Sequence, residues 1–110
     1  MAVTHVVMFQ FKPGVKPESV QELCERMLAL KEQCIHPETE SSYLKSCVGG
    51  KDISVQGIQK GMSHLFVVEF NSIADRDYYA LHDPVHLEFV KWSESVTSNV
   101  QALDFTHGRF

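Results

Sequence analysis

The segment from Val3 to Phe11 most constrains the fold, because it is apolar on both faces of an extended strand. Alternation divides it into two sets, with Val3, His5, Val7, Phe9 and Phe11 on one face and Thr4, Val6, Met8 and Gln10 on the other. A strand that is apolar on both faces has to be covered on both sides. One layer of helices covers a single face of a sheet, so this chain needs a second cover as well.

Three further segments are predicted as strands, at residues 64–70, 43–49 and 99–105. Residues 64–70 alternate most clearly, and the other two segments are weaker. The segment 50–62 is rich in glycine, and we expect it to be a flexible connection between two strands.

Three helices are predicted between the strands. Apolar residues recur at helical spacing over residues 17–33, which indicates a helix with one buried stripe. Ser72 is a good N-cap for a short helix over 73–81. Asp83-Pro84 begins the third helix, because a carboxylate at the N-cap and a proline at the first position both favour a helix start.

The order of these elements, β-α-β-β-α-α-β, predicts an α+β fold. We expect a ferredoxin-like four-stranded antiparallel sheet with helices on one face. With 110 residues, the chain is expected to form a single domain over residues 1–110. The simplest second cover for the first strand is the sheet of another copy, so the sequence predicts a symmetric homodimer.

Composition and charge exclude several classes of partner. The net charge is −4 and no Lys/Arg cluster accompanies aromatic residues, so we expect no nucleic-acid partner. No apolar run approaches the roughly 18 residues of a membrane span, and residues 1–5 lack the layout of a signal peptide. The three cysteines form no C-x-x-C pair, so we interpret them as reduced thiols of a cytoplasmic protein rather than disulfides or zinc ligands.

Three histidines occupy positions that look interior: His5 and His64 on strand faces, and His86 after Asp83-Pro84. An imidazole buried without a partner costs roughly 1–3 kcal/mol, and imidazole is the side chain that best moves protons near neutral pH. If the two strands are neighbours, His5 and His64 converge on one pocket, where we expect them to bind substrate. The alternatives are satisfied core histidines, an interface pair, or a zinc site of all three imidazoles, which lacks any local pair of ligands.

His86 is the candidate general base, because it would be the third residue of a helix. The N-terminus of a helix carries partial positive charge, which disfavours protonation of an imidazole there. A neutral imidazole can accept a proton from carbon or from a phenol. The alternative is a structural histidine that bonds to Asp83 or to the backbone.

Four aromatic residues are candidates for the same site. Tyr78 and Tyr79 are adjacent on a helix and point about 100° apart, so at most one of them faces a cavity. That tyrosine is a candidate to orient or protonate an enolate oxygen, with a half-buried core tyrosine as the alternative. Phe66 and Phe89 are predicted either to contact a substrate or to fill the core.

Four motifs occur in order along nearly the whole chain. They are His5-Val-Val-Met-Phe-Gln-Phe-Lys12, Gly61-Met-Ser-His64-Leu-Phe-Val-Val-Glu-Phe70, Asp77-Tyr78-Tyr79 followed by Asp83-Pro84-Val85-His86, and Leu103-Asp104-Phe105. Together they resemble the stress-responsive A/B barrel family, called Dabb, and most closely its fungal members. The resemblance implies a homodimer whose two sheets close into a dimeric α+β barrel, with a small cavity between each sheet and its helices.

The resemblance also implies a chemistry. In plant polyketide cyclases of this family, a histidine at the position of His86 and a tyrosine just upstream close a linear polyketide by an aldol reaction, without cofactor or metal. Histidines that match His5 and His64 line the same cavity. This chain differs from the cyclase pattern His-Pro-x-His by one additional residue before His86. The tyrosine position therefore corresponds either to Tyr79, the nearest match, or to Tyr78.

Two functional hypotheses follow. The first is a cofactor-independent cyclase, lyase or isomerase that acts on a polyketide-like, hydrophobic small molecule by His/Tyr acid–base chemistry. The second is a non-catalytic stress-responsive dimer in which the histidines are structural. Family membership alone does not decide between them, because one fold can carry many functions.

Overall fold

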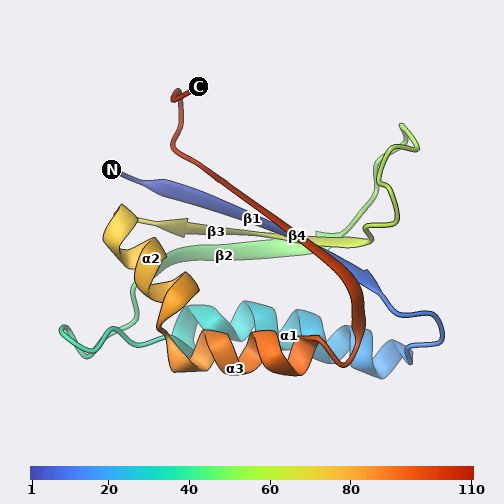
Figure 1. Ribbon diagram of the computed structural model, residues 1–110, viewed down its shortest axis with the longest axis horizontal. Coiled ribbons are helices and arrows are strands. Elements are labelled where there is room, and N and C mark those ends of the chain that lie inside the picture. The colour runs from blue at the N-terminus through green and yellow to red at the C-terminus, as the bar shows by residue number, and fades with distance from the viewer.

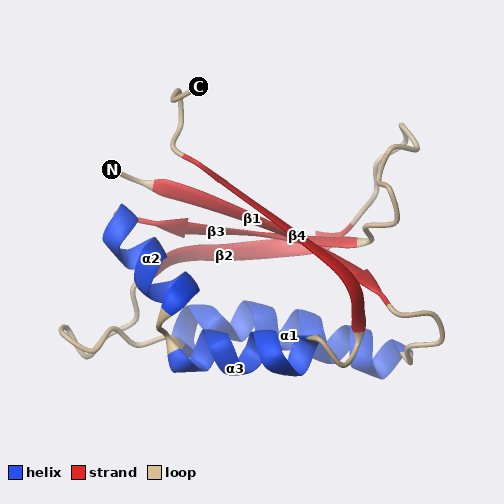
Figure 2. Ribbon diagram, in the orientation of Figure 1, coloured by secondary structure: helices blue, strands red, loops and turns tan.

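The computed structural model describes residues 1–110. Four strands form one antiparallel sheet, and three helices lie against one of its faces (Figures 1 and 2). In chain order the elements are β1 (Val3–Phe11), α1 (Pro17–Gln33), β2 (Leu44–Lys51), β3 (His64–Phe70), α2 (Ile73–Leu81), α3 (Pro84–Ser93) and β4 (Thr97–Phe105). None of the helices has the length and apolar character needed to cross a membrane. The four-stranded antiparallel sheet with helices on one face confirms the predicted α+β, ferredoxin-like fold.

Two predicted strands have different bounds in the structure. β2 runs to Lys51 instead of ending at residue 49, because its ladder with β3 continues until Lys51 lies opposite His64. β4 begins at Thr97 instead of residue 99, because an irregularity after Gln10 lets Phe11 pair with Thr97. The rest of the predicted connection has no helix or strand, and the Asp52 side chain accepts hydrogen bonds there from Ser54 N–H and the Gln59 amide.

The sheet order is β2-β3-β1-β4, so β1 lies between two neighbours. Register fixes the position of every side chain along β1: His5 lies opposite Val68 and Asp104, whereas Phe9 lies opposite His64. The side chains of β1 and β3 that face the helices pack against a stripe on α1. The resulting core includes Val7, Phe9, Phe66, Val68, Phe70, Leu23, Met27, Leu30 and Cys34.

No helix covers the opposite face of the sheet (Figure 2). This face carries exposed apolar side chains. Val6 lies at its centre, with Val67 on one side and Leu103 on the other. Leu103 is 71% exposed, and Leu65 and Val48 are also exposed. We call this surface, centred on Val6, Val67 and Leu103, the open face. It is the face for which the sequence predicts a second cover.

Candidate functional site

A cavity of about 310 Å³ lies between the helix-facing side of the sheet and helices α2 and α3. Most of its wall is apolar, with Val7 and Phe9 from β1, Phe89 from α3 and Val100 from β4. The polar side chains in the wall include His5, Tyr79, His86, Ser93 and Glu94. An apolar cavity with a few polar groups is the usual form of a small-molecule site.

Tyr79 and His86 come together because α2 and α3 meet at a tight junction. Their rings stack with centroids 3.8 Å apart and an interplanar angle of 22°. Tyr79 is only 1% exposed, and burial raises the pKa of its hydroxyl well above its usual value. The Tyr79 hydroxyl has no hydrogen-bond partner. A buried hydroxyl without a partner is costly, so the Tyr79 hydroxyl is an unsatisfied donor within the fold.

His86 is held in one defined protonation form. Its Nδ1 lies 2.8 Å from the backbone carbonyl oxygen of Tyr79. A carbonyl can only accept, so Nδ1 carries the hydrogen and Nε2 keeps its lone pair. Burial lowers the pKa of His86 below 6.5 and outweighs the hydrogen bond to the Tyr79 carbonyl, which raises it; the nearby His5 lowers the pKa further, and Asp83 has the smallest effect, which raises it. His86 is therefore a neutral imidazole near pH 7 with a free acceptor nitrogen.

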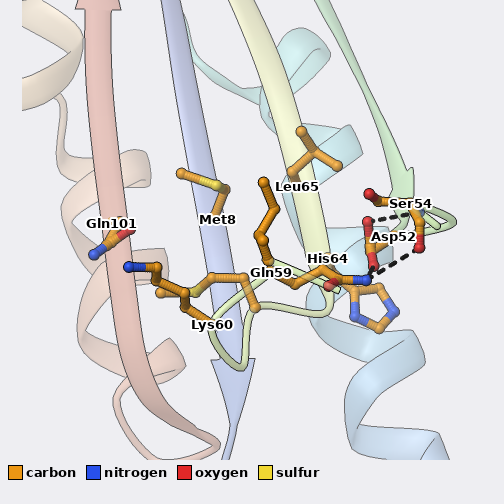
Figure 3. Close-up of a pocket in the computed structure, with 10 residues that line it drawn as sticks. Met8, Asp52, Ser54, Gln59, Lys60, His64, Leu65 and Gln101 are labelled. Atoms are coloured by element: carbon orange, nitrogen blue, oxygen red, sulfur yellow. Dashed lines mark hydrogen bonds between the residues drawn. The ribbon is translucent and has the colours of Figure 1, made fainter. Parts of the chain in front are cut away.

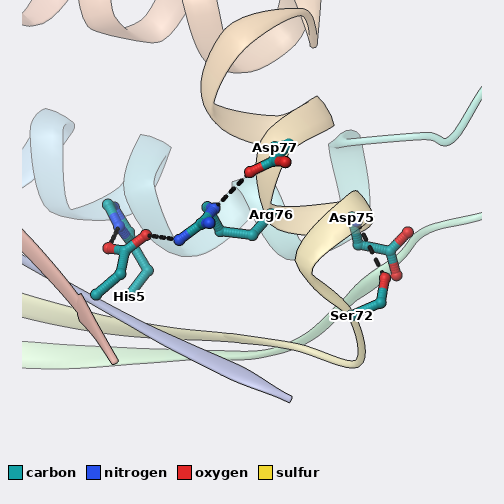
Figure 4. Close-up of polar contacts among 6 residues, drawn as sticks. His5, Ser72, Asp75, Arg76 and Asp77 are labelled. Atoms are coloured by element: carbon teal, nitrogen blue, oxygen red, sulfur yellow. Dashed lines mark hydrogen bonds and ion pairs between the residues drawn. The ribbon is translucent and has the colours of Figure 1, made fainter. Parts of the chain in front are cut away.

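His5 is oriented by a chain of charged groups (Figure 4). Its Nδ1 lies 2.5 Å from one carboxylate oxygen of Asp104, and Arg76 donates to the other oxygen at 2.7 Å. Arg76 also donates to Asp77, and these two hydrogen bonds raise the arginine pKa. An ionised carboxylate accepts hydrogen bonds, so Nδ1 of His5 carries a hydrogen that it donates to Asp104. The His5 ring centroid is 6.0 Å from that of Tyr79.

Helix α2 supplies both Arg76 and Tyr79, and its starting point fixes where each lies. The Ser72 side chain accepts a hydrogen bond from Asp75 N–H at 3.1 Å, which caps the helix as its sequence predicts (Figure 4). With the helix start fixed, Arg76 reaches Asp104 at the sheet edge while Tyr79, three residues later, lies in the cavity wall.

His64 does not join His5 and His86, contrary to the expected convergence. β1 and β3 are neighbours, but His64 pairs with Phe9, four residues along the strand from His5. At about 3.3 Å per residue, this offset is about 13 Å. The His64 ring instead contacts Phe11 edge-on and hydrogen-bonds with the Ser63 hydroxyl.

The remaining candidates divide between cavity and core. Phe89 lines the cavity, whereas Phe66 is buried in the core against Phe9. Tyr78 lies outside the cavity and contacts His36 and Tyr43. No three His, Cys, Asp or Glu side chains gather in a way that would hold a metal ion, so the three-imidazole zinc site is not assembled.

A second cavity, of about 350 Å³, lies beside the open face (Figure 3). Met8, Leu65 and Gln101 come from the sheet, and Asp52 and Lys60 come from the β2–β3 connection. The Asp52 carboxylate is already bonded within its own loop. This cavity is larger, but it lacks the paired Tyr79 and His86, so the first cavity is the better candidate for chemistry.

The important residues that sequence reasoning missed are Asp104 and Arg76. Asp104 lies within the Leu103-Asp104-Phe105 motif, and the register of β4 places it beside His5. Its position on the helix-facing side, two residues after Ala102, follows from alternation once β4 is paired with β1. Arg76 gives no such signal, because its partner is 28 residues away in the sequence.

Comparison with known proteins identifies the family. The pattern of the "Stress responsive A/B Barrel Domain", Dabb, matches residues 3–107. The chain belongs to this family. The stress-response A/B barrel domain-containing protein HS1 of Arabidopsis thaliana is 31% identical over 103 residues, which span 94% of this chain and 87% of HS1. The resemblance inferred from the sequence motifs is thus confirmed.

Two solved structures illustrate the range of this Dabb-like fold. A hydroxynitrile lyase from Passiflora edulis superposes with a TM-score of 0.80 at 20% identity, covering 99% of this chain and 96% of the lyase. A dimeric ferredoxin-like protein of unknown function from Thermobifida fusca gives a TM-score of 0.74 at 19% identity, covering 96% and 91%. At these identities the likeness shows the fold alone.

Acidification is expected to destabilise this Dabb protein through His86. Because its folded pKa lies below 6.5, the unfolded chain binds a proton that the folded chain does not bind in the interval between the two values. The free energy of unfolding therefore falls as the pH drops below 6.5, and this contribution levels off below the folded pKa. His64, whose pKa burial also lowers, acts in the same direction.

Urea unfolding of wild type, His86→Asn and His82→Asn from about pH 7.5 to about pH 5.5 measures this effect. We expect His86→Asn to lose less stability on acidification than wild type, and the exposed control His82→Asn to follow wild type. An unchanged pH dependence in His86→Asn would contradict a neutral, half-buried His86.

Proposed function

We propose that this Dabb protein catalyses an aldol-type cyclisation, or the related carbon–carbon cleavage, of a polyketide-like small molecule by acid–base chemistry. The observation that carries the proposal is the pairing of Tyr79 and His86 in one cavity. Tyr79 offers a buried hydroxyl without a partner, and His86 offers a free, neutral Nε2. A donor for an oxyanion and a base for a C–H proton are the two groups that an enolisation needs.

The reaction starts with removal of a proton from a carbon next to a carbonyl group. His86 Nε2 takes this proton, and the carbonyl becomes an enolate whose oxygen accepts a hydrogen bond from Tyr79. The enolate carbon then attacks a second carbonyl of the same molecule, forming the new C–C bond. The proton on His86 passes to the resulting alkoxide oxygen, which restores the neutral imidazole. Loss of water afterwards leads toward an aromatic ring.

His5 is proposed to bind the polar end of the substrate. Asp104, itself held by Arg76, keeps the His5 hydrogen on Nδ1, so Nε2 is free as an acceptor for a substrate hydroxyl. A hydrogen bond from one ring nitrogen to a carboxylate that is itself held in place keeps a site histidine in one orientation. The two imidazoles are therefore proposed to have distinct roles.

The size and lining of the cavity suit a compact, largely apolar substrate. A volume of about 310 Å³ is near the lower end of small-molecule sites, which span roughly 300–1,000 Å³. Phe9, Phe89 and Val100 exclude water from the reacting atoms, which strengthens each polar contact. We therefore propose a substrate that closes to a single ring and carries a short apolar tail.

The alternative is a non-catalytic role in which the same histidine is structural. The observation in its favour is that His86 Nδ1 is satisfied inside the fold, so His86 has a structural bond as well as a free nitrogen. The two functions differ in whether Nε2 is ever used. Removal of Nε2 alone is therefore the decisive change.

We also propose that two copies pack through their open faces. The central apolar residues Val6, Val67 and Leu103 have no helix to cover them, and structurally similar proteins are described as dimeric. Packing sheet against sheet buries these side chains in the way that helices bury the other face. It also completes the cover that β1 requires.

A cytoplasmic location is part of the same proposal. All three cysteines are free thiols, and burial raises the pKa of each of them, which makes them poor nucleophiles. Such thiols agree with a reducing compartment.

The catalytic proposal is tested with a panel of linear tri- and tetraketide thioesters, with ring products measured by mass spectrometry. His86→Asn keeps a donor near the position of Nδ1 and removes Nε2, so we expect turnover to fall by about 10²–10⁴-fold. Tyr79→Phe removes the oxyanion donor and should lower turnover by about 10²–10³-fold. The exposed His82→Asn is the matched control. Turnover by His86→Asn at the wild-type rate, or none by wild type on any substrate, would contradict the proposal.

The dimer proposal is tested by light scattering during size-exclusion chromatography. A charge at the centre of a sheet-to-sheet interface would be desolvated and unpaired, so Leu103→Lys should weaken dimerisation by at least about tenfold. Leu81→Lys is the control, because Leu81 is 64% exposed on α2, away from the open face. We expect dimers for wild type and Leu81→Lys and monomers for Leu103→Lys. A monomeric wild type would overturn the proposal.

A further inference from the structure

The carboxylate of Asp83 is buried at the junction of three elements. Asp83 is 1% exposed and is the N-cap of α3, where one oxygen accepts Val85 N–H at 2.9 Å. The other oxygen accepts the Tyr43 hydroxyl, which lies just before β2, at 2.5 Å. The Cys34 thiol, at the end of α1, lies near the same carboxylate. Burial is the main cause that raises the pKa of this thiol, and the Asp83 carboxylate is the second.

Asp83 also lies in the stretch that makes this chain one residue longer before His86. The backbone accommodates that stretch in a specific way. Tyr78 carbonyl oxygen accepts His82 N–H at 2.9 Å and also Asp83 N–H at 2.8 Å. In a continuing helix, Asp83 N–H would instead bond to the carbonyl of Tyr79, four residues earlier.

This turn leaves the Tyr79 carbonyl without a backbone donor. Asp83 N–H is used by Tyr78, and the next residue, Pro84, has no N–H to offer. The free carbonyl is the group that accepts Nδ1–H of His86. The hydrogen bond that selects the form of His86 therefore exists because the α2–α3 turn diverts the Asp83 amide.

We propose that Asp83, held by the Tyr43 hydroxyl, is a positioning residue that fixes the tautomer and orientation of His86. The carboxylate sets the first residue of α3, and that start places His86 below the Tyr79 carbonyl. Tyr43 supplies the donor that satisfies the second carboxylate oxygen, since a buried carboxylate with a missing donor is strongly destabilised. Relaxation of the turn would return the Tyr79 carbonyl to Asp83 N–H and release the His86 ring.

The tautomer is a property of the protein alone, so this inference goes beyond the proposed reaction. Only its consequence for turnover rests on the proposed function. With the hydrogen on Nδ1, Nε2 is the base; with the hydrogen on Nε2, that base is lost. A cap with a purely structural role would lower the free energy of unfolding without changing the tautomer in the folded molecules.

The experiment is a long-range ¹H–¹⁵N correlation on histidine-labelled protein above the His86 pKa, which distinguishes protonated from unprotonated ring nitrogens. Four proteins are compared: wild type, Asp83→Asn, Tyr43→Phe and Thr97→Val. Thr97→Val is the matched control, because it removes another buried hydroxyl that bonds to the opposite end of α3, through the Ser93 carbonyl. Tyr43→Phe keeps the ring that packs on Tyr78 and removes only the hydroxyl, so it serves as the test if Asp83→Asn does not fold.

We expect a single Nδ1–H form of His86 in wild type and Thr97→Val, and a mixture of tautomers in Tyr43→Phe and Asp83→Asn. An Nε2–H form in wild type would overturn the assignment of His86. A pure Nδ1–H form in a folded Tyr43→Phe or Asp83→Asn would overturn the positioning role. If the protein turns over a substrate, Tyr43→Phe should lower kcat more than it changes KM. Absence of turnover would remove the catalytic proposal and leave the tautomer result intact.

Discussion

β1 lies between β3 and β4 with both of its faces apolar, and the rest of the molecule is arranged around this constraint. On the helix-facing side, Val7 and Phe9 pack into the core with α1 and α3. His5 is on the same side near the start of the strand, where its ring pairs with Tyr79 of the short helix α2. The cavity is therefore a consequence of how one long helix and two shorter helices cover a single face of the sheet. The open face has no such cover, and a second copy is proposed to cover it.

The cavity holds two imidazoles whose second nitrogens have different partners. His86 donates to a neutral carbonyl and is desolvated, whereas His5 donates to a carboxylate that an arginine holds in place. Environments that differ in this way are how a protein assigns different proton-transfer roles to chemically identical groups. Both imidazole rings pair with the ring of Tyr79, whose buried hydroxyl has no hydrogen-bond partner within the fold.

Much of the fold could be predicted from local sequence, because alternation and capping are local properties. Val3–Phe11, Pro17–Gln33 and His64–Phe70 have the predicted bounds. The site was harder to predict, since alternation gives the face of a strand but not the depth along it. His64 faces the helices as predicted, yet the register sets it four residues away from His5.

Long-range pairings explain the other gaps. The choice between Tyr78 and Tyr79 depends on the rotation of α2, which is set by packing and by the turn into α3. Asp104 pairs with His5 across 99 residues of sequence, and Asp83 pairs with Tyr43 across 40. No spacing rule connects such residues before the sheet is assembled.

The most direct test of the central claim, that the Tyr79 and His86 cavity is a small-molecule site, is an NMR titration with a 4-alkylphenol. This one-ring compound mimics the enolate oxygen and an apolar tail. We expect saturable shifts of the Tyr79, His86 and Phe89 signals, with signals near Lys60 and Leu65 unchanged. Shifts confined to Lys60 and Leu65, or no saturable shift at any of these residues, would contradict it.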